Sequence, residues 1–245
     1  MAVTELTPDD ADWAADLMVA RRREYEDYSP VFWHPAAHAR AVHVRFLRRQ
    51  IANPATVALR SPRGFLIAQL RPAEAFVDDF ALDPAGTWAE DGAELLLAAW
   101  ARVGTTDVTA LRVVTARADE PKSALLRSLG LRLVEQWWVH DLPAAPSKAA
   151  GPDPRLAPPE RIEGPGFSGL LGPAPPVYDP GGPVLLADRV TAGADLAVLT
   201  AEATRRGAVL LVVPAPPGSA HARELAGRGW AVASDWYFGL PSAAE

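Results

Sequence analysis

Two adjacent carboxylates interrupt an apolar segment of the sequence. Asp78 and Asp79 stand between Val77 and Phe80 in the stretch FVDDFALDPAGTWAEDGAELL, residues 76–96. Strand interiors normally exclude Asp, because an ionised carboxylate is costly to desolvate and because the residue favours turns. An acid in such a place can act as a general base, since partial burial raises a carboxyl pKa from about 4 towards neutrality.

Strand alternation predicts different surroundings for the two acids. Successive side chains of a strand point to opposite faces of the sheet, so only one of Asp78 and Asp79 is expected to face a given site. The sequence leaves open which of the two it is. The structural alternative is that one Asp binds a neighbouring backbone group or Arg while the other is solvated.

A helix start follows this strand closely. The strand is expected to end at Asp83-Pro84, and an apolar helical segment begins at Gly92. A helix N-terminus carries unpaired N–H groups and partial positive charge, which suits a phosphate, and a glycine there has no Cβ to obstruct it. Glu90 and Asp91 would repel an anion, so the alternative is that they cap an ordinary helix.

A third cluster of chemically useful residues is aromatic. The stretch YEDYSPVFWHPAAH, residues 25–38, combines aromatic rings with a titratable histidine, which suits an amine or an aromatic acceptor. The structural alternative is that these rings fill a helix–helix corner. No histidine pair has trustworthy metal-binding spacing, so no metal site is expected. The candidate substrate-binding residues are Tyr28, Phe32, Trp33 and His34.

Composition limits the classes of function. The chain has 245 residues, of which 49% are hydrophobic and 22% charged, as in soluble globular proteins. A net charge of −6 argues against a nucleic-acid partner. No apolar run approaches the roughly 18 residues of a membrane span, and no signal peptide is evident, so we expect a cytoplasmic protein without a membrane partner. The absence of cysteine excludes disulfides and a cysteine nucleophile.

The chain is expected to contain two related parts. Residues 143–160 are rich in proline and small residues, as in a linker, and separate a domain at 1–142 from a shorter one at 161–245. Several segments recur about 100 residues apart, which indicates a duplication. The recurring segments are GAEL (92–95) with GADL (193–196), LRVVTA (111–116) with LLVVPA (210–215), and LLRSLGLRLVEQWWV (125–139) with RELAGRGWAVASDWYF (223–238).

Hydrophobic periodicity and turn residues predict the elements of the first part. Strands are expected at 4–6, 56–60, 64–71, 75–82, 111–115 and 131–140, and helices at 8–25, 36–51, 92–102 and 122–128. In the second helix, Ala39, Val42, Phe46 and Leu47 form the expected apolar stripe. The arginine clusters 21–23 and 48–49 are expected to favour helix C-termini. The second part is expected to repeat strand, strand, helix, strand, helix, strand.

This order of elements resembles the GNAT superfamily of N-acetyltransferases. The resemblance covers about residues 3–142, with a shortened copy at about 166–240. It is carried by VDDFAL (77–82), the loop DPAGTWAED (83–91), the helix GAELLLAAW (92–100) and the helix-Gly-strand ending LLRSLGLRLVEQWW. It implies an α/β fold of two tandem units, each a mixed central sheet flanked by helices.

The resemblance also implies an activity. It implies transfer of acetyl from acetyl-CoA, as co-substrate, to an amine of a small molecule or peptide, with Asp78 or Asp79 as the base. The backbone of Phe80, Ala81 and Leu82 would pair with the pantetheine arm. The turn formed by Trp88, Gly92 and Ala93 would meet the pyrophosphate. The chain could also form a homodimer.

The sequence departs from the family pattern at two places. Thr87 and Glu90 stand where the phosphate loop of the family has Arg or Gln and a glycine. A tyrosine that protonates the departing thiolate in many members is replaced by Leu126, and by Leu225 in the shortened copy. Tyr178 or water is an alternative donor. These departures support the alternative of a non-catalytic GNAT-like ligand- or CoA-binding protein.

Overall fold

The computed structural model describes residues 2–84, 86–143, 158–191 and 194–240. Most of the proposed linker, and Gly193 of the repeated GADL segment, lie outside these ranges. The described chain is an α/β protein with a mixed sheet, which confirms the predicted fold class. The helices are α1 (Ala11–Glu26), α2 (Ala39–Ile51), α3 (Ala93–Val103), α4 (Glu120–Ser128), α5 (Leu196–Arg205) and α6 (Ala220–Gly227). The strands are β1 (Thr4–Glu5), β2 (Thr56–Ser61), β3 (Gly64–Leu70), β4 (Ala75–Leu82), β5 (Leu111–Ala116), β6 (Arg132–Asp141), β7 (Glu160–Gly164), β8 (Phe167–Gly172), β9 (Val184–Val190), β10 (Leu210–Ala215) and β11 (Ala231–Gly239).

The chain forms two compact units. Unit 1 contains the described residues of 1–24, 40–134 and 235–245, and unit 2 contains the described residues of 25–39 and 135–234. Two strands run through both units: β6 passes into unit 2 at Glu135, and β11 passes into unit 1 at Asp235. The two compact units are groups of residues that contact one another in space. The expected domains, 1–142 and 161–245, are two related stretches of sequence, and this division stays a prediction.

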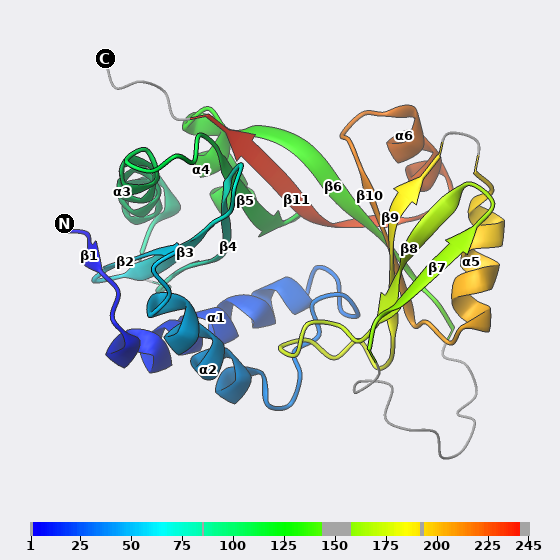
Figure 1. Ribbon diagram of the computed structural model, residues 1–245, viewed down its shortest axis with the longest axis horizontal. Coiled ribbons are helices and arrows are strands. Elements are labelled where there is room, and N and C mark those ends of the chain that lie inside the picture. Colours follow the sequence, from blue (N-terminus) through cyan, green and yellow to red (C-terminus); the bar gives the residue numbers. More distant parts are fainter. Residues whose placement is uncertain (1, 85, 144–157, 192–193, 241–245) are drawn as a thin grey trace. The chain divides into compact units, whose positions relative to one another are not determined.

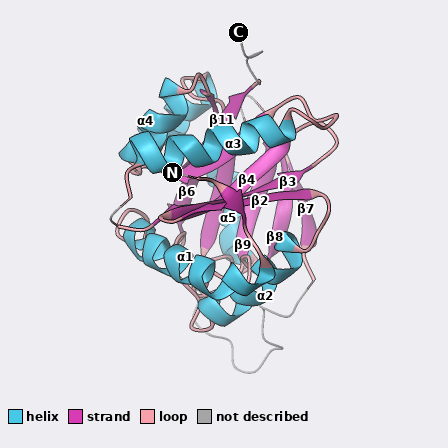
Figure 2. Cartoon of the chain, turned by 90° about the vertical axis from the view of Figure 1, so that its left-hand side faces the viewer, coloured by secondary structure: helices cyan, strands magenta, loops and turns pink. Residues whose placement is uncertain are grey.

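In unit 1, helices cover both faces of the sheet. The strand order is β1-β2-β3-β4-β5-β11, with β2, β3 and β4 antiparallel and β4 parallel to β5. Figure 2 shows α3 and α4 on one face of these strands and α1 and α2 on the other. Each face has its own core, because alternate strand residues bury against different helices. Leu66 packs with Leu95 and Leu126 on the α3–α4 face, and Ile67 packs with Leu47 on the α1–α2 face.

In unit 2, the strand order is β7-β8-β9-β10-β6 (Figure 1). Strands β9 and β10 are parallel and the other neighbours are antiparallel. Strand β7 was not expected from the sequence. Only Ile162 of this strand is buried, so its sequence, ERIEG, lacks the apolar alternation by which strands are recognised.

Local polar groups decide where several helices begin. Thr7 and Asp10 form a capping box over a 3₁₀ turn at Pro8–Asp10, so α1 itself begins only at Ala11. Helix α4 begins at Glu120 and not at residue 122 as expected, because the side chain of Asp119 accepts from the Lys122 amide.

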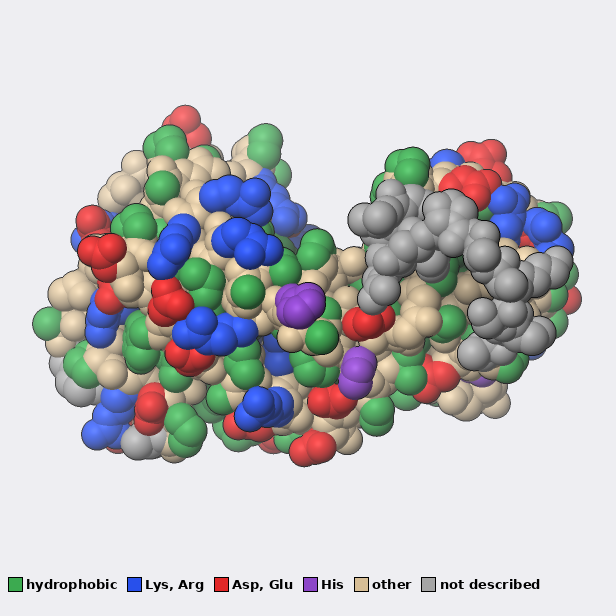
Figure 3. Space-filling view, turned by 90° about the horizontal axis from the view of Figure 1, so that it is seen from below, with side chains coloured by type: hydrophobic (Ala, Val, Ile, Leu, Met, Phe, Trp, Pro, Cys, Tyr) green, Lys and Arg blue, Asp and Glu red, His purple; other side chains and the backbone are tan. Residues whose placement is uncertain are grey.

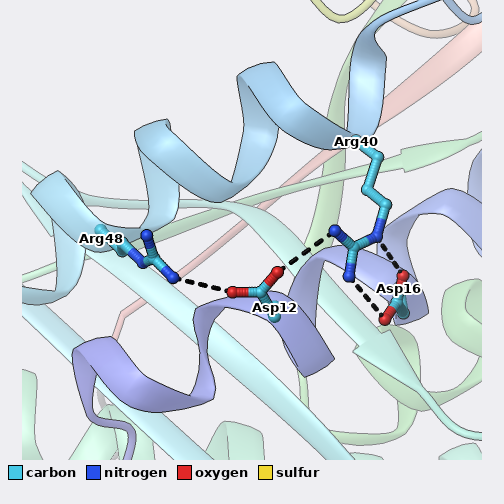
Figure 4. Close-up of polar contacts among 4 residues, drawn as sticks. All are labelled: Asp12, Asp16, Arg40 and Arg48. Carbon is cyan, nitrogen blue, oxygen red and sulfur yellow. Dashed lines mark hydrogen bonds and ion pairs between the residues drawn. The ribbon is translucent and has the colours of Figure 1, made fainter.

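Ion pairs join α1 to α2 on the exposed surface of unit 1. Arg40 binds Asp16 with an Nε–Oδ1 distance of 2.6 Å and reaches Asp12 at 3.2 Å, and Arg48 binds Asp12 at 2.8 Å (Figure 4). Figure 3 shows acidic and basic side chains interspersed over the face that carries these helices. Exposed ion pairs of this kind contribute little to stability, but they link α1 and α2 side by side.

Candidate functional site

A β-bulge explains why one strand carries two acids. Between two paired positions of β3 and β4, the single residue Ile67 stands opposite both Asp78 and Asp79. The extra residue of a bulge is not held in the ladder, and bulges re-aim side chains, often beside active sites. The pairs that flank the bulge are Leu66 with Phe80 and Ala68 with Val77.

The bulge places both aspartates on the same face of the sheet. Val77 and Phe80, on either side of the pair, both belong to the core beneath α3 and α4, whereas Ile67 belongs to the core beneath α1 and α2. Asp78 and Asp79 therefore share the face of Ile67, which agrees with the influence of α1 and α2 side chains on both carboxyl pKa values. The expectation that the two acids face opposite sides is wrong, because it assumed an unbroken period of two.

Asp79 is buried and held by a chain of polar groups. Its exposed fraction is 5%, and its Oδ1 lies 3.1 Å from Nε2 of the buried His43, close enough for a hydrogen bond but poorly aligned for one. A guanidinium nitrogen of Arg22 contacts Nδ1 of the same ring. Asp79, His43 and Arg22 therefore form a continuous buried chain of polar groups that runs from β4 through α2 to α1.

The charges in this chain set the protonation of Asp79. Burial by itself would raise the pKa of this carboxyl, but His43, followed by Arg22 and Lys122, outweighs burial and holds the pKa below its ordinary value. A carboxyl that is this well stabilised as an anion is a poor proton acceptor at neutral pH. Asp79 is therefore suited to positioning.

Asp78 has the opposite character. Its side chain is exposed, so it can meet a solute. Desolvation by the surrounding protein, followed by the negative charge of Asp79, nevertheless raises the pKa of Asp78 to about 6. The cations Arg22 and Lys122, and His43, lower this pKa but do not cancel the rise. A carboxylate with a pKa near neutrality is ionised at pH 7 and still binds a proton readily, which is the property of a general base.

The bulge lies where β4 and β5 part. The two strands are in parallel register only as far as Val77 and Val113, and in the described pairing no β4–β5 pair follows. Beyond that point, Phe80, Ala81 and Leu82 pair with β3 on their other side. We call the region between residues 78–82 of β4 and residues 114–116 of β5 the fork. The backbone of Phe80, Ala81 and Leu82 borders the fork, and its contact with a pantetheine arm, which the resemblance implies, stays a prediction.

The side chain of Lys122 reaches into the fork from α4. Its Nζ donates to the carbonyl oxygen of Val114 at 3.0 Å. The Ala75 amide donates to Ala110, so the Ala110 oxygen faces β4, and by strand alternation the Val114 oxygen does too. The ammonium therefore replaces β4 as the partner of the first β5 carbonyl past the divergence. It also lies 5.2 Å from the centre of the Phe80 ring.

Lys122 is 1% exposed and shares the fork with several charges. Burial and the nearby Arg21 lower the pKa of Lys122 to about 8, against the opposing effect of the Asp119, Asp78 and Asp79 carboxylates. The ammonium is thus a cation that can lose its proton close to physiological pH.

The turn before α3 is a π-helical turn, Trp88–Gly92, whose polar groups largely bind one another. The Thr87 amide donates to the buried Asp91 carboxylate at 2.8 Å, and the Gly92 amide donates to the Thr87 oxygen at 3.1 Å. The Ala93 amide donates to oxygens within the same turn. Asp91 therefore binds a backbone amide at the start of the helix, as the alternative of a capping role predicts.

Gly92 is required here by packing. A Cβ on this residue would lie 2.8 Å from Cε3 of Trp88 and 2.9 Å from a methyl carbon of Leu125, both closer than van der Waals contact allows. The indole of Trp88 in turn packs edge-on against Phe80, with 4.9 Å between ring centroids, and below the guanidinium of Arg21. The absence of a side chain at Gly92 thus allows Trp88 to pack between the turn and Phe80, which borders the fork.

The predicted substrate-binding aromatics belong to unit 2, whereas the two aspartates belong to unit 1. Trp33 is 6% exposed, and its ring packs against Tyr25, Phe32 and Tyr178, with 4.7–5.5 Å between centroids. Its Nε1 donates to the Ala233 oxygen at 3.3 Å. These contacts give Trp33 a structural role.

The other members of that set are more accessible. Tyr28 is 52% exposed, and the exposed His34 places Nδ1 2.5 Å from an oxygen of Glu26. The Asp179 amide donates to the His34 carbonyl, which fixes this segment within unit 2. A substrate-binding role for Tyr28, Phe32, Trp33 and His34 stays a prediction.

Sequence reasoning missed three residues of the site, and each had a signal. Arg22 lies four residues after the buried Met18, on the apolar stripe of α1. His43 lies midway between Ala39 and Leu47, so the buried stripe of α2 runs through the histidine, whereas Val42 and Phe46 are only partly buried. Lys122 precedes the buried Leu126 by four residues in a chain that otherwise relies on arginine.

Unit 2 contains a bulge at the corresponding place in its sheet. Gly169 of β8 stands alone opposite Ala187 and Asp188 of β9, and the β9–β10 register stops at Leu186 and Val212. Ala187 is buried in the core of unit 2, whereas Asp188 is exposed, is paired with Arg161 and accepts a hydrogen bond from Ser168. The bulge of unit 2 therefore also carries an acid, but this acid is paired with an arginine.

Two kinds of feature are absent from the part of the chain that the structure describes. Among those residues, no group of three or more His, Cys, Asp or Glu side chains is arranged to hold a metal ion. Within the same ranges, none of the helices has the length and apolar character needed to span a bilayer.

Comparison with known proteins identifies the fold. No protein-family model and no curated protein matches the sequence. Solved structures do match over essentially the whole chain. A Thermoplasma acidophilum protein assigned as an acetyltransferase is 12% identical, with a TM-score of 0.62 over 98% of this chain and 100% of its own. A GCN5-related N-acetyltransferase from Sphaerobacter thermophilus is 14% identical, with a TM-score of 0.57 over 100% of this chain and 97% of its own.

A third structure bears on the tandem arrangement. A tandem GNAT protein from the clavulanic acid biosynthesis pathway, solved without acetyl-CoA, is 14% identical, with a TM-score of 0.51 over 100% of this chain and 99% of its own. The chain therefore has the tandem GNAT acetyltransferase fold, which confirms the resemblance inferred from the sequence. Identities this low establish the fold and leave the substrate open.

Proposed function

We propose that this tandem GNAT-fold protein transfers an acyl group, acetyl in the simplest case, from acyl-CoA to an amine of a small molecule or peptide, using the fork of unit 1. The observation that carries the proposal is Asp78: an exposed carboxylate with a pKa raised to about 6, set on a bulge where β4 and β5 part. A carboxyl whose pKa is shifted towards neutrality by desolvation and by a specific charged neighbour is a candidate for a general base.

The geometry supports the following roles for the neighbouring residues. Asp78 accepts a proton from the attacking amine, directly or through water. Asp79 is a positioning residue, which is itself fixed by its contact with His43 and, through His43, with Arg22. The peptide groups of Phe80, Ala81 and Leu82 on the fork side of β4 bind the pantetheine arm and orient the thioester carbonyl against a strand N–H. Without a cysteine to carry the acyl group, transfer is direct.

The proposed pyrophosphate contacts need one adjustment. The amides of Gly92 and Ala93 donate within the turn, so these two residues shape the site by packing with Trp88. The anion would meet the earlier peptide groups of the turn, at residues 88–91, where the helix start is positive. Glu90 there weakens binding, and affinity for coenzyme A is expected to be modest.

One observation favours a second candidate, a GNAT-fold protein that binds a ligand without catalysis. Lys122 places a buried side chain in the fork, and a thioester could enter only alongside it. On this alternative, Lys122 fills the place of the pantetheine arm and the fold serves another ligand.

Calorimetric titration with acetyl-CoA, followed by a thiol-release assay on a panel of amines, separates the two candidates. The transferase predicts binding and amine-dependent release of free thiol. Asp78→Asn should abolish most of that release while leaving acetyl-CoA binding intact. Asp188→Asn, which changes the matching bulge of unit 2, is the control and should leave release unchanged. No binding heat at high micromolar acetyl-CoA would favour the non-catalytic protein.

A further inference from the structure

The leaving group sets a second chemical requirement at the fork. When an amine takes the acyl group of a thioester, the C–S bond breaks and the sulfur departs as a thiolate. A free thiol has a pKa of about 8.5, so at neutral pH the thiolate takes up a proton, and a nearby donor speeds its departure. The residue expected from the family resemblance is absent, because Leu126 is a buried aliphatic side chain.

Lys122 is a proton donor whose side chain reaches into the fork. It lies one helical turn before Leu126 on α4, so the two side chains lie on the same face of the helix. Its Nζ lies between the diverging strands, 3.0 Å from the Val114 oxygen and beside the ring of Phe80. An ammonium has three N–H groups, and the bond to Val114 uses one of them.

We propose that Lys122 is the general acid that protonates the departing thiolate; the assignment rests on the transferase function proposed above. The neutral amine attacks the thioester carbonyl, the new C–N bond forms and the C–S bond breaks. The amine proton passes to Asp78, and an Nζ proton of Lys122 passes to sulfur. Transfer of a proton from Asp78 to the Lys122 amine, directly or through water, restores both groups.

The charges around Lys122 are consistent with this role. Asp119 caps the same helix, Arg21 approaches from α1, and Asp78 and Asp79 face it from β4. Burial in this setting brings the pKa of Lys122 to about 8, close to that of the thiol it would protonate. An arginine, with a pKa above about 12, could not give up a proton there.

Steady-state kinetics on Lys122→Met and Lys122→Arg test the assignment. For a general acid, kcat and kcat/KM should fall together by about 100-fold or more in both variants, while acetyl-CoA binding stays within a few-fold of wild type. The wild-type rate should decline above about pH 8, and the Met variant should lack that decline. If Lys122 acts only through its charge, Arg restores most of the rate, and the assignment is overturned.

A change of leaving group gives a readout that a structural role would not move. With 4-nitrothiophenyl acetate as donor, the leaving thiolate needs no proton, so the defect of Lys122→Met should largely disappear, as should the alkaline decline of the wild type. The comparison of the wild-type pH profiles with the two donors needs no variant, so it remains valid even if Lys122→Met folds poorly. Thermal unfolding would reveal poor folding of the variant. Arg102→Met, which removes an exposed cation paired with Glu5, controls for net charge.

The outcomes distinguish the two proposals. Wild-type protein that releases thiol, together with a Lys122→Met variant of unchanged rate and pH profile, overturns the general-acid assignment alone. Wild-type protein that binds acetyl-CoA but releases no thiol with any amine overturns the transferase and the acid assignment together.

Discussion

Asp78→Asn should stabilise the protein at pH 8. The pKa of Asp78 rises from 3.8 to about 6 on folding, so the folded state favours the protonated acid. The stability contributed by that proton is fully present below pH 3.8 and is lost as pH rises through 6. Above pH 6 the folded protein carries an ionised group that would be better solvated in the unfolded chain, and Asn removes the unfavourable charge.

The magnitude follows from the pKa shift and the exposure. A shift of about two units corresponds to at most about 3 kcal/mol, at about 1.4 kcal/mol for each unit. Because Asp78 is exposed, solvent screens much of this, and we expect about 1 kcal/mol of added stability at pH 8. Urea unfolding of wild type and Asp78→Asn at pH 8 and at pH 3.5 measures it, and the difference should vanish at the lower pH.

The neighbouring residue provides a control of opposite sign. The pKa of Asp79 is lowered on folding, so its stabilising contribution is present above pH 3.8 and is lost as pH falls through the folded value. Asp79→Asn removes the buried carboxylate that faces His43 and should destabilise the protein at pH 8 by about 3 kcal/mol. A loss of stability at pH 8 in Asp78→Asn would refute the reasoning, because it would show that Asp78 is held by partners and is not poised as a base.

Three further predictions concern the surrounding structure. Gly92→Ala should destabilise unit 1 by about 1–3 kcal/mol and change the fluorescence of Trp88, because the new Cβ overlaps the indole. Trp33→Ala should destabilise unit 2 by about 3–5 kcal/mol in urea unfolding, whereas Tyr28→Ala should leave stability unchanged and raise KM only if that ring binds the acceptor. Arg40→Ala should shift the urea midpoint only slightly, and not at all in 1 M NaCl, because its ion pairs are exposed.

Local pattern was enough to predict the order of elements and the resemblance. The apolar alternation of β3 and the punctuation at Asp83-Pro84 depend on neighbours in the chain, so strands and helices could be predicted from the sequence. Strand β7 shows the limit of this reasoning: an edge strand with one buried residue leaves almost no periodic signal.

The site itself depends on residues far apart in the chain. The sequence showed that Asp78 and Asp79 are unusual residues for a strand. Which of the two has a lowered pKa depends on Arg22 and His43, which approach from two helices. The pairing of β3 with β4 introduced the bulge that turned both acids to one face. Sequence determined which groups are available for chemistry, because side-chain type and local period are written in it. Tertiary structure alone decided their protonation, because a pKa is set by burial and by charges that only folding brings near.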